Sequence, residues 1–165
     1  MSTLEHKIDF VMLFTVVGAN PNGDPLSGNM PRTDYDGFGE VSDVCVKRKI
    51  RNRMQDMGHS IFVQSNDRID DDKKSLEERF GASFDSPKKD PDDKVYHESC
   101  KRWMDVRSFG QVMTFQKRSI GIRGPVSISL AKSLSPVDVI SMQITRSTNG
   151  MIAKGESGRS SDTMG

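Results

Sequence analysis

The chain has 165 residues, 34% of them hydrophobic, which is enough for one compact domain with an apolar core. Its formal net charge of +1 gives no overall preference for a polyanion, but the charge is unevenly distributed: residues 1–66 sum to about −1, residues 67–98 to about −4 and residues 99–165 to about +6. No apolar run approaches membrane-spanning length, and the only two cysteines lack metal-site spacing, so composition argues against a membrane protein or a disulfide framework and favours the cytoplasm.

The first predicted element is a strand at residues 8–17, IDFVMLFTVV. Both of its faces are apolar, so we expect a central strand covered on both sides, with Phe10 and Phe14 in the core. Residues 18–40 follow as a long loop, rich in glycine and in the turn-forming pairs Asn-Pro, Asn-Gly, Asp-Pro and Asp-Gly. A loop of this length inside a compact domain is often functional.

A basic helix is predicted next. Ser42 is a good N-cap, a stripe of Val46, Ile50, Met54 and Met57 recurs at helical spacing, and Gly58 ends the pattern. The helical period places three cations on one flank of that stripe: Lys47, Arg48 and Arg51. Lys49 falls on the opposite flank and Arg53 at the edge of the stripe.

The second half alternates predicted strands and helices. We expect short strands at 60–65, from Val112 to Phe115, at 126–131 and at 140–145, and a helix over 94–109 that Gly110 stops. Residues 66–93 are charged and turn-rich, and are predicted to be a solvated insertion that contains a short helix around 70–80. The order of elements predicts an α+β domain: a ferredoxin-like or RNA-recognition-motif sheet backed by two helices.

The distribution of cations suggests a surface for a polyanion. Phosphate contacts are predicted from three elements: the loop (Asn20, Asn22, Asn29, Arg32), the basic helix (Lys47, Arg48, Arg51) and the connection 117–124 (Lys117, Arg118, Arg123). Each has a plainer interpretation, since helices tolerate cations on solvated faces and Gly-rich segments are commonly turns. The two alternatives for the basic helix remain balanced.

Acidic residues of the loop allow a second chemistry. Asp24, Asp34 and Asp36 are able, if they come together, to hold a divalent metal and cut a phosphodiester, although acids in turn-rich loops are more often turn residues. His97 and Cys100 make no complete zinc set. We therefore expect no metal and no cofactor, and we keep a metal-dependent ribonuclease acting through Asp24, Asp34 or Asp36 as the alternative function.

Several blocks of the sequence together resemble one known family: NPNGDPLSGNMPRTD and GFGEVSDVCVKRKIRN, then DVRSFGQVM and GIRGPVSISLAKSLSP, and finally ITR and a terminal DTMG. This chain is similar to the type I-C CRISPR-associated backbone subunit, the Csd-two branch of the Cas-seven family, from about Phe10 to its end. The resemblance is weakest across 66–98. Family members continue beyond DTMG, so we expect the chain to correspond to the first part of such a protein.

The resemblance implies a modified RNA-recognition-motif palm with insertions, whose copies stack into a filament along the guide crRNA and present it to target DNA in antiviral defence. Sequence reading is then delegated to base pairing. The implied partners are the guide, further copies of the chain and other Cascade subunits (a crRNA-processing Cas-five type, a large Cas-eight type and a small subunit). Residues 147–165, with Lys154 and Arg159, are expected to begin a thumb-like hairpin arm.

Overall fold

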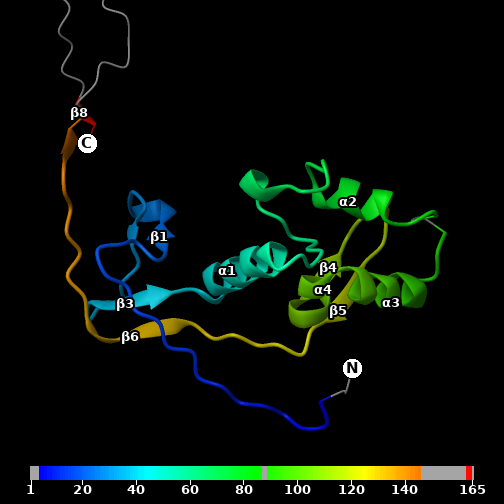
Figure 1. The fold of residues 1–165 in the computed structure, drawn as a ribbon, viewed down its shortest axis with the longest axis horizontal. Helices are drawn as coiled ribbons and strands as arrows, with labels where there is room; N and C mark the ends of the chain where they lie inside the picture. Colours follow the sequence, from blue (N-terminus) through cyan, green and yellow to red (C-terminus); the bar gives the residue numbers. More distant parts are fainter. Residues whose placement is uncertain (1–3, 87–88, 146–162, 165) are drawn as a thin grey trace, which may run out of the picture.

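The computed structural model describes residues 4–86, 89–145 and 163–164 (Figure 1). Short 3₁₀ turns occur at Pro25–Ser27 and Asn66–Arg68. The helices and strands are β1 (Gly23–Asp24), β2 (Met30–Pro31), β3 (Phe38–Val41), α1 (Asp43–Asp56), α2 (Leu76–Ala82), α3 (Asp92–Arg102), α4 (Met104–Phe109), β4 (Gly110–Met113), β5 (Ile120–Arg123), β6 (Ala131–Pro136), β7 (Ile144–Thr145) and β8 (Thr163–Met164).

Strand pairing is antiparallel throughout the described residues. The pairs are β1 with β2, β3 with β6, β4 with β5 and β7 with β8, each a two-stranded sheet. The mixture of helices and small sheets confirms the predicted α+β class. The described strands do not join into the single sheet of a ferredoxin-like or RNA-recognition-motif palm, so that finer arrangement stays a prediction.

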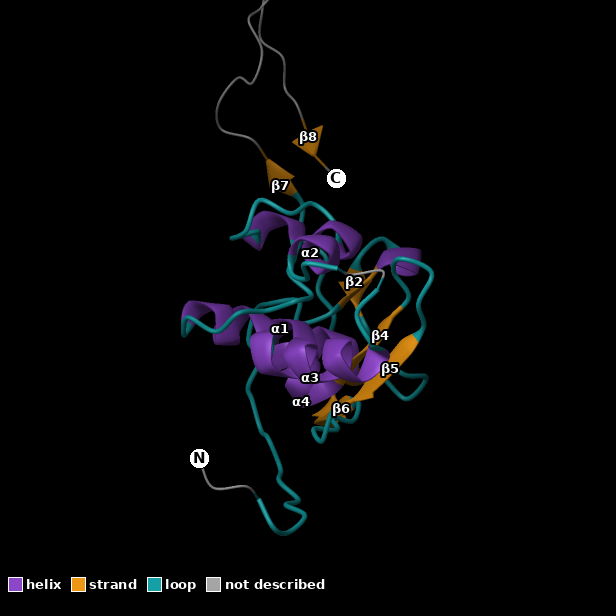
Figure 2. Ribbon diagram, turned by 90° about the vertical axis from the view of Figure 1, so that its right-hand side faces the viewer, coloured by secondary structure: helices purple, strands orange, loops and turns teal. Residues whose placement is uncertain are grey.

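The main core lies where α2, α3 and α4 meet the β4–β5 hairpin (Figure 2). Its buried members are Phe62, Phe80, Val95, Trp103, Val106, Met113, Ile120 and Ile122. Aromatic rings form its centre: the Phe62 and Trp103 ring centroids are 4.5 Å apart, and Phe80 and Phe115 are 5.5 Å apart. Tilted aromatic pairs at such distances add about 0.5–1.5 kcal/mol each beyond their burial.

The helix predicted over 94–109 is broken in two at Trp103. This residue has an extended backbone (φ −113°, ψ 116°) and stands both after α3 and before α4. The break turns its indole into the core against Phe62, and the next N–H, that of Met104, donates to the Ser60 carbonyl at 3.0 Å. Local helical periodicity could not reveal this break, because the contacts that stabilise it come from Ser60 and Phe62, more than forty positions earlier in the chain.

Helix α1 confirms the predicted basic helix closely. It begins after the Ser42 N-cap, whose Oγ accepts from the Cys45 N–H, and ends before Gly58, which has a positive φ of 82°. Of the predicted apolar stripe, Val46 is buried, whereas Met57 at the far end is 63% exposed.

The prediction of a buried strand at residues 8–17 is wrong. These residues form no helix or strand, and Phe10 and Phe14, expected in the core, are 62% and 47% exposed. We call residues 8–17 the N-terminal arm. It is apolar enough for a buried strand, but no strand in the described part of the chain pairs with it.

Other predicted strands shift or disappear. Residues 60–65 and 126–130 form none, the strand expected from Val112 begins at Gly110 and ends at Met113, and of 140–145 only Ile144–Thr145 is paired. The second half of the connection 117–124 forms β5. Strand β6 instead begins where the 126–131 alternation ends, because its partner β3 pairs with Ala131 through Pro136.

Within the charged segment 66–93, the predicted short helix exists as α2, and it contributes to the core. Phe80 and Arg79 are both buried, at 0% and 4% exposure. Phe84 is half-buried, with its ring centroid 4.9 Å from that of Phe80. The helix therefore anchors this segment, which composition alone had assigned to solvent.

Candidate nucleic-acid interface

The loop 18–40 and helix α1 are joined through one asparagine side chain. Asn22 Oδ1 accepts hydrogen bonds from the Ser42 N–H at 2.8 Å and from the Ser42 hydroxyl at 2.9 Å. Ser42 in turn caps α1. Asn22 thus holds the helix start against the loop, so the predicted loop contact and the predicted helix contact belong to one rigid unit.

The first half of the loop is a tight turn around β1 and β2. Asn29 has a positive φ of 62°, its N–H donates to the Asp24 carbonyl at 2.8 Å, and its own carbonyl accepts from the Asn20 side chain at 2.7 Å. A Cβ on Gly23 would lie 1.9 Å from the Asn29 side chain and 2.9 Å from the Asn29 carbonyl oxygen, so a larger residue there would force Asn29 to shift. Arg32 reaches Asp24 at 3.4 Å and is exposed.

The second half of the loop is a turn built on Asp34. Asp34 Oδ1 accepts from the N–H groups of Asp36 (3.0 Å) and Phe38 (2.9 Å), and its other oxygen pairs with Lys132 of β6. The hydrogen bond from Lys132 is the largest influence on the Asp34 carboxyl and lowers its pKa; the same contact raises the pKa of Lys132. Asp34 therefore serves the turn and the link to β6.

The three loop acids do not assemble a metal site. Asp24 is occupied by the Leu26 N–H and the Ser27 hydroxyl, and Asp34 by its own turn. Across residues 4–86, 89–145 and 163–164, no group of three or more His, Cys, Asp or Glu side chains is placed to hold an ion.

All three cations predicted on one flank of α1 are engaged within the protein. Arg48 Nη1 donates to the Val63 carbonyl at 2.7 Å, and Arg51 Nε donates to Asp105 Oδ2 at 3.0 Å, with the guanidinium 5.2 Å from the centre of the Phe109 ring. Burial, followed by the positive charge of Arg51, lowers the pKa of Arg48. The third, Lys47, pairs with Asp43 one turn earlier at 3.0 Å.

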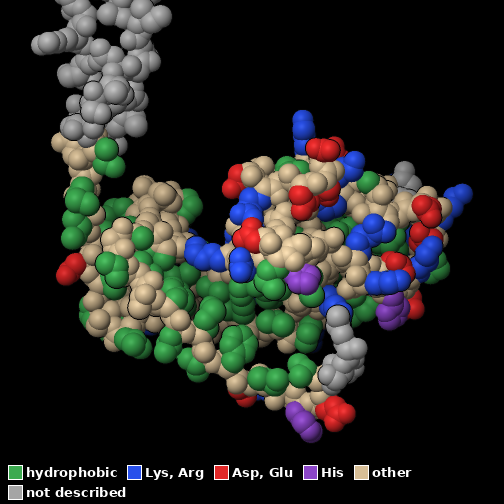
Figure 3. Space-filling view, in the orientation of Figure 1, with side chains coloured by type: hydrophobic (Ala, Val, Ile, Leu, Met, Phe, Trp, Pro, Cys, Tyr) green, Lys and Arg blue, Asp and Glu red, His purple; other side chains and the backbone are tan. Residues whose placement is uncertain are grey.

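The opposite flank of α1 carries the accessible cations. Lys49 and Arg53 are four residues apart and both exposed, and neither forms an ion pair with any residue the structure describes. Lys49 Nζ lies 3.1 Å from the Pro21 carbonyl, so this flank borders the loop. Figure 3 shows a few Lys and Arg side chains at the end of α1 that faces the apolar lobe of β3 and β6, and others, interspersed with Asp and Glu, over the rest of the helical side.

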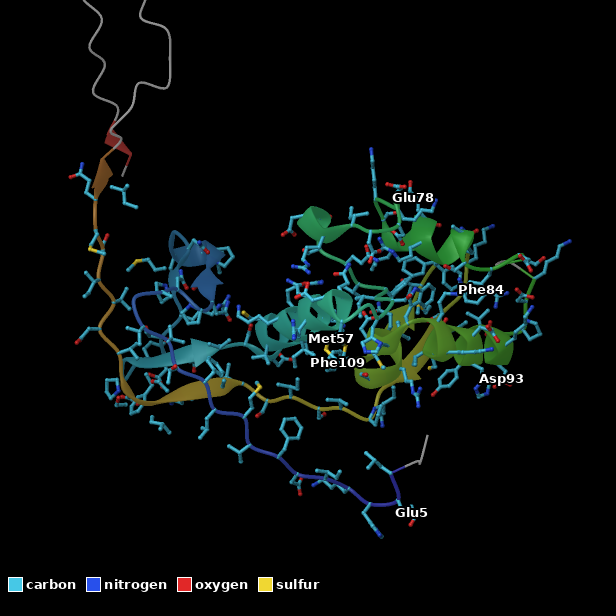
Figure 4. All side chains as sticks on the ribbon, in the orientation of Figure 1. Glu5, Met57, Glu78, Phe84, Asp93 and Phe109 are labelled. Carbon is cyan, nitrogen blue, oxygen red and sulfur yellow. The ribbon has the colours of Figure 1, made fainter. Side chains whose placement is uncertain are left out.

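The cations predicted in 117–124 lie elsewhere. Arg118 is half-buried against the start of α3, donating to Asp92 at 2.7 Å and to the Asp90 carbonyl. That helix start, marked by Asp93 in Figure 4, is at the far end of the molecule from β1. Lys117 and Arg123 are exposed. The structure therefore unites the loop with α1 but does not bring Arg118 to them. Lys154 and Arg159 fall outside the described residues.

Sequence reasoning missed the residue that fixes α1 in place. Asp105 is fully buried; its carboxylate accepts from Arg51 and from the N–H groups of Phe62 (2.8 Å) and Val63 (3.1 Å). Its flanking residues Trp103 and Val106 are core residues. An isolated acid between two core positions was a usable signal, since a buried carboxylate needs partners.

Comparison with known proteins identifies relatives of this chain. Residues 6–165 match the family described as "CRISPR-associated protein Cas7". A protein of that description from Haloferax volcanii is 30% identical over 118 residues, which is 70% of this chain and 34% of the relative. The chain thus spans about a third of the length of that relative. No described helix is long and apolar enough to cross a membrane.

Proposed function

Because the chain belongs to the Cas7 family of CRISPR-associated proteins, we propose that it is part of a backbone subunit that binds guide crRNA along its phosphates in a CRISPR effector complex. The observation that carries this is the rigid unit of loop and α1, joined by Asn22 and Ser42, with accessible cations beside it. Its role is to grip and present the guide, with no catalysis of its own.

We place the phosphate contacts on the accessible flank of α1. Lys49 and Arg53 are free of ion pairs among the described residues, and Lys49 borders the loop through its hydrogen bond to the Pro21 carbonyl. A phosphate that binds Lys49 therefore displaces only neutral partners, the Pro21 carbonyl and Cys45 Sγ. Arg48 and Arg51 lie on the other flank of α1 and contribute their positive charge. Two like charges share this part of the helix, with Asp105 as a buried counter-charge, and a nearby polyanion would relieve their repulsion.

Arg32, Asn20 and Asn29 complete the surface from the loop side. These three residues are exposed, and the turns on Asp24 and Asp34 hold the loop that carries them. A prearranged loop loses less conformational entropy on binding than a mobile one. Lys117, Arg123, Lys154 and Arg159 remain proposed contacts of a more distant part of the guide.

The finer assignment rests on the sequence blocks. We assign the chain to the type I-C, Csd-two branch, working in the cytoplasm with further copies of itself, with Cas-five and Cas-eight type subunits and a small subunit, and with target DNA through the guide. The alternative of a metal-dependent ribonuclease is not favoured, since Asp24 and Asp34 are committed to loop turns and Asp36 lies alone at a turn.

RNA binding over a range of salt concentrations tests the proposal. The double variant Lys49→Ala, Arg53→Ala should weaken binding of a single-stranded guide RNA and reduce the log–log salt slope by about 1.4, because each single-strand phosphate contact contributes about 0.7. The matched control is Lys101→Ala, Arg102→Ala, which removes the same charge from the exposed end of α3. Lys47→Ala tests the other flank of α1.

The outcomes separate cleanly. Loss in the α1 variant with retention in the α3 control supports the loop–helix surface. Equal losses would mean that only total charge matters, and unchanged binding in all variants would remove α1 as the contact. Incubating the bound RNA with Mg²⁺ tests the enzymatic alternative, for which cleavage abolished by Asp36→Ala would be required.

A further inference from the structure

A cavity of about 240 Å³ lies between the turn at Asn66–Arg68 and the start of α2. Its lining includes four polar side chains and an apolar part: Asn66, Lys73, Lys74 and Ser75, with Ile69 and Leu76. None of the cations proposed above to contact the guide belongs to this cavity. Figures 1 and 2 show α2 above α1 and β6 below it, so the cavity is well separated from the apolar lobe.

The charge of the lining is opposite to that of the segment that carries it. Residues 64–79 contain more acidic than basic residues, yet the charged side chains that line the cavity are Lys73, Lys74 and Arg79, all of them cations. Asp71 neutralises Arg79, so the two lysines supply the net positive charge. Neither lysine forms an ion pair within the described residues. The cavity therefore favours an anion.

Hydrogen-bond donors without an acceptor gather at this cavity. In the part of the chain that the structure describes, the side chains of Lys73, Lys74 and Asn66 donate to no protein atom. Ser75 Oγ accepts from the Glu78 N–H at 3.1 Å, which leaves its own hydrogen free to donate. A ligand with several acceptor oxygens would satisfy all four groups.

The walls of the cavity are held in place by a buried arginine. Arg79 is 4% exposed, and its Nη2 donates to Gln64 Oε1 at 3.2 Å and to the Lys73 carbonyl at 3.0 Å. Gln64 Nε2 in turn donates to Asp70 at 2.6 Å, and Phe80, the neighbour of Arg79, belongs to the core. A ligand would thus meet donors that are already positioned, which lowers the entropic cost of binding.

We infer that this cavity is a binding site for a phosphate monoester. Such a group carries a charge of about −1.5 to −2 at neutral pH and three acceptor oxygens, which suits two lysines with a hydroxyl and an amide beside them. A phosphodiester within a nucleic-acid chain carries one charge and fewer free oxygens, so it would use the set less fully. Ile69 and Leu76 offer an apolar wall to the organic part of the ligand.

Isothermal titration calorimetry tests the site, with nuclease-treated full chain in phosphate-free buffer and uridine 5′-monophosphate as the probe. Binding is expected, and it should weaken by about tenfold or more for each lysine removed in Lys73→Ala, Lys74→Ala, because each loses a charged hydrogen bond. The matched control is Lys101→Ala, Arg102→Ala, which removes the same charge from the exposed end of α3 and should bind as the wild type does.

A second variant changes the charge of the cavity without changing its shape. Asn66→Asp places a negative charge among the donors, and it should weaken binding although the exposed position leaves the fold intact. Backbone amide NMR locates the ligand: the signals of residue 66 and of residues 73–76 should shift on titration, and those of α1 should not.

Uridine and inorganic phosphate as further probes identify the source of the phosphate. Tighter binding of the nucleotide than of inorganic phosphate indicates a mononucleotide, and equal binding indicates free phosphate at the same site. Uridine binding as tightly as its monophosphate would overturn the inference, and so would no binding of either anion at millimolar concentration or an equal loss in the α3 control.

The site does not depend on the proposed grip on the guide. Lys49→Ala, Arg53→Ala should bind the nucleotide as the wild type does, and a loss there would place the anion on α1 and overturn the inference. Because the titration contains no RNA, its failure leaves the crRNA-binding proposal standing, and failure of RNA binding leaves the cavity standing.

Discussion

Arg79 and Asp105 hold opposite ends of the same residue. Arg79 Nη1 donates to the Phe62 carbonyl at 2.8 Å, while the Asp105 carboxylate accepts from the Phe62 N–H at 2.8 Å. Phe62 stands at the centre of the aromatic core, in a segment with no strand to satisfy its peptide groups. Two buried charged side chains, from α2 and α4, therefore replace the sheet that sequence analysis expected at residues 60–65.

Removing Asp105 should be the most damaging single truncation around α1. Asp105→Ala leaves Arg51, which is 13% exposed, without its counter-charge and orphans two backbone N–H groups. Breaking a buried pair in this way costs about 3–5 kcal/mol of unfolding free energy. Urea denaturation measures it. Asp105→Asn, which keeps the shape, should lose less, and a loss below about 1 kcal/mol in the alanine variant would contradict the assigned role.

The pair of Arg79 and Asp71 predicts a pH dependence. Arg79 donates to both Asp71 oxygens, at 2.5 and 2.9 Å, and this lowers the pKa of Asp71 from its ordinary value of 3.8. A lowered folded-state pKa stabilises the fold above that ordinary value, and the contribution is lost as the pH falls through the lowered pKa. The stability difference between wild type and Asp71→Asn should therefore be full at neutral pH and shrink below about pH 4. A difference that stays constant across this range would exclude the linkage.

Asn22 offers a test of the link between loop and helix. Asn22→Ala removes the acceptor for the Ser42 N–H and hydroxyl, which should lower stability by about 1–2 kcal/mol. Limited proteolysis should cut the loop 18–40 faster. Asn66→Ala is the control, because Asn66 is exposed and no hydrogen bond of its side chain is seen in the described structure. Equal proteolysis of the two variants would argue that the loop is held by other contacts.

Two glycines of the β4–β5 hairpin make a matched pair. Gly110 has a φ of +79°, and a Cβ there would lie 2.4 Å from the Ile122 carbonyl oxygen. Gly110→Ala should therefore destabilise the protein by more than about 1 kcal/mol. At Gly121 a Cβ meets nothing within 4 Å, so Gly121→Ala should stay within about 0.5 kcal/mol of wild type in the same thermal or urea unfolding assay.

Features encoded locally were predictable from the sequence. Helix α1 has an N-cap, an apolar stripe and a terminating glycine between Ser42 and Gly58, and the structure has the cap and the glycine where they were expected. The helix break at Trp103, the burial of Arg79 and the start of β6 depend on partners far along the chain, and no local pattern contains them. The N-terminal arm shows the limit most clearly, since its composition predicts burial but does not name the element that covers it.

The candidate site also has some features that the sequence predicts and others that depend on distant partners. That the loop and α1 bear polar and basic residues is plain from the sequence. The sequence does not show which of these cations stay accessible, because the partner of Arg51 lies 54 residues away along the chain and the partner of Arg48 lies 15 residues away. The helical period grouped Lys47, Arg48 and Arg51 on one flank and so favoured them over Lys49 and Arg53. The internal partners of that group make Lys49 and Arg53 the more accessible cations.

The pairing of β3 with β6 has a consequence for synthesis on the ribosome. Phe38 and Pro136 are partners, so β3 must wait for most of the chain to be made before it can pair. Translation at about 5–20 residues per second makes that a wait of seconds, long compared with the microseconds in which a helix or hairpin forms. The helices and the β4–β5 hairpin can settle during this interval. The loop 18–40 and its turn on Asp34, which Lys132 of β6 completes, would then be the last part of the domain to take its final shape.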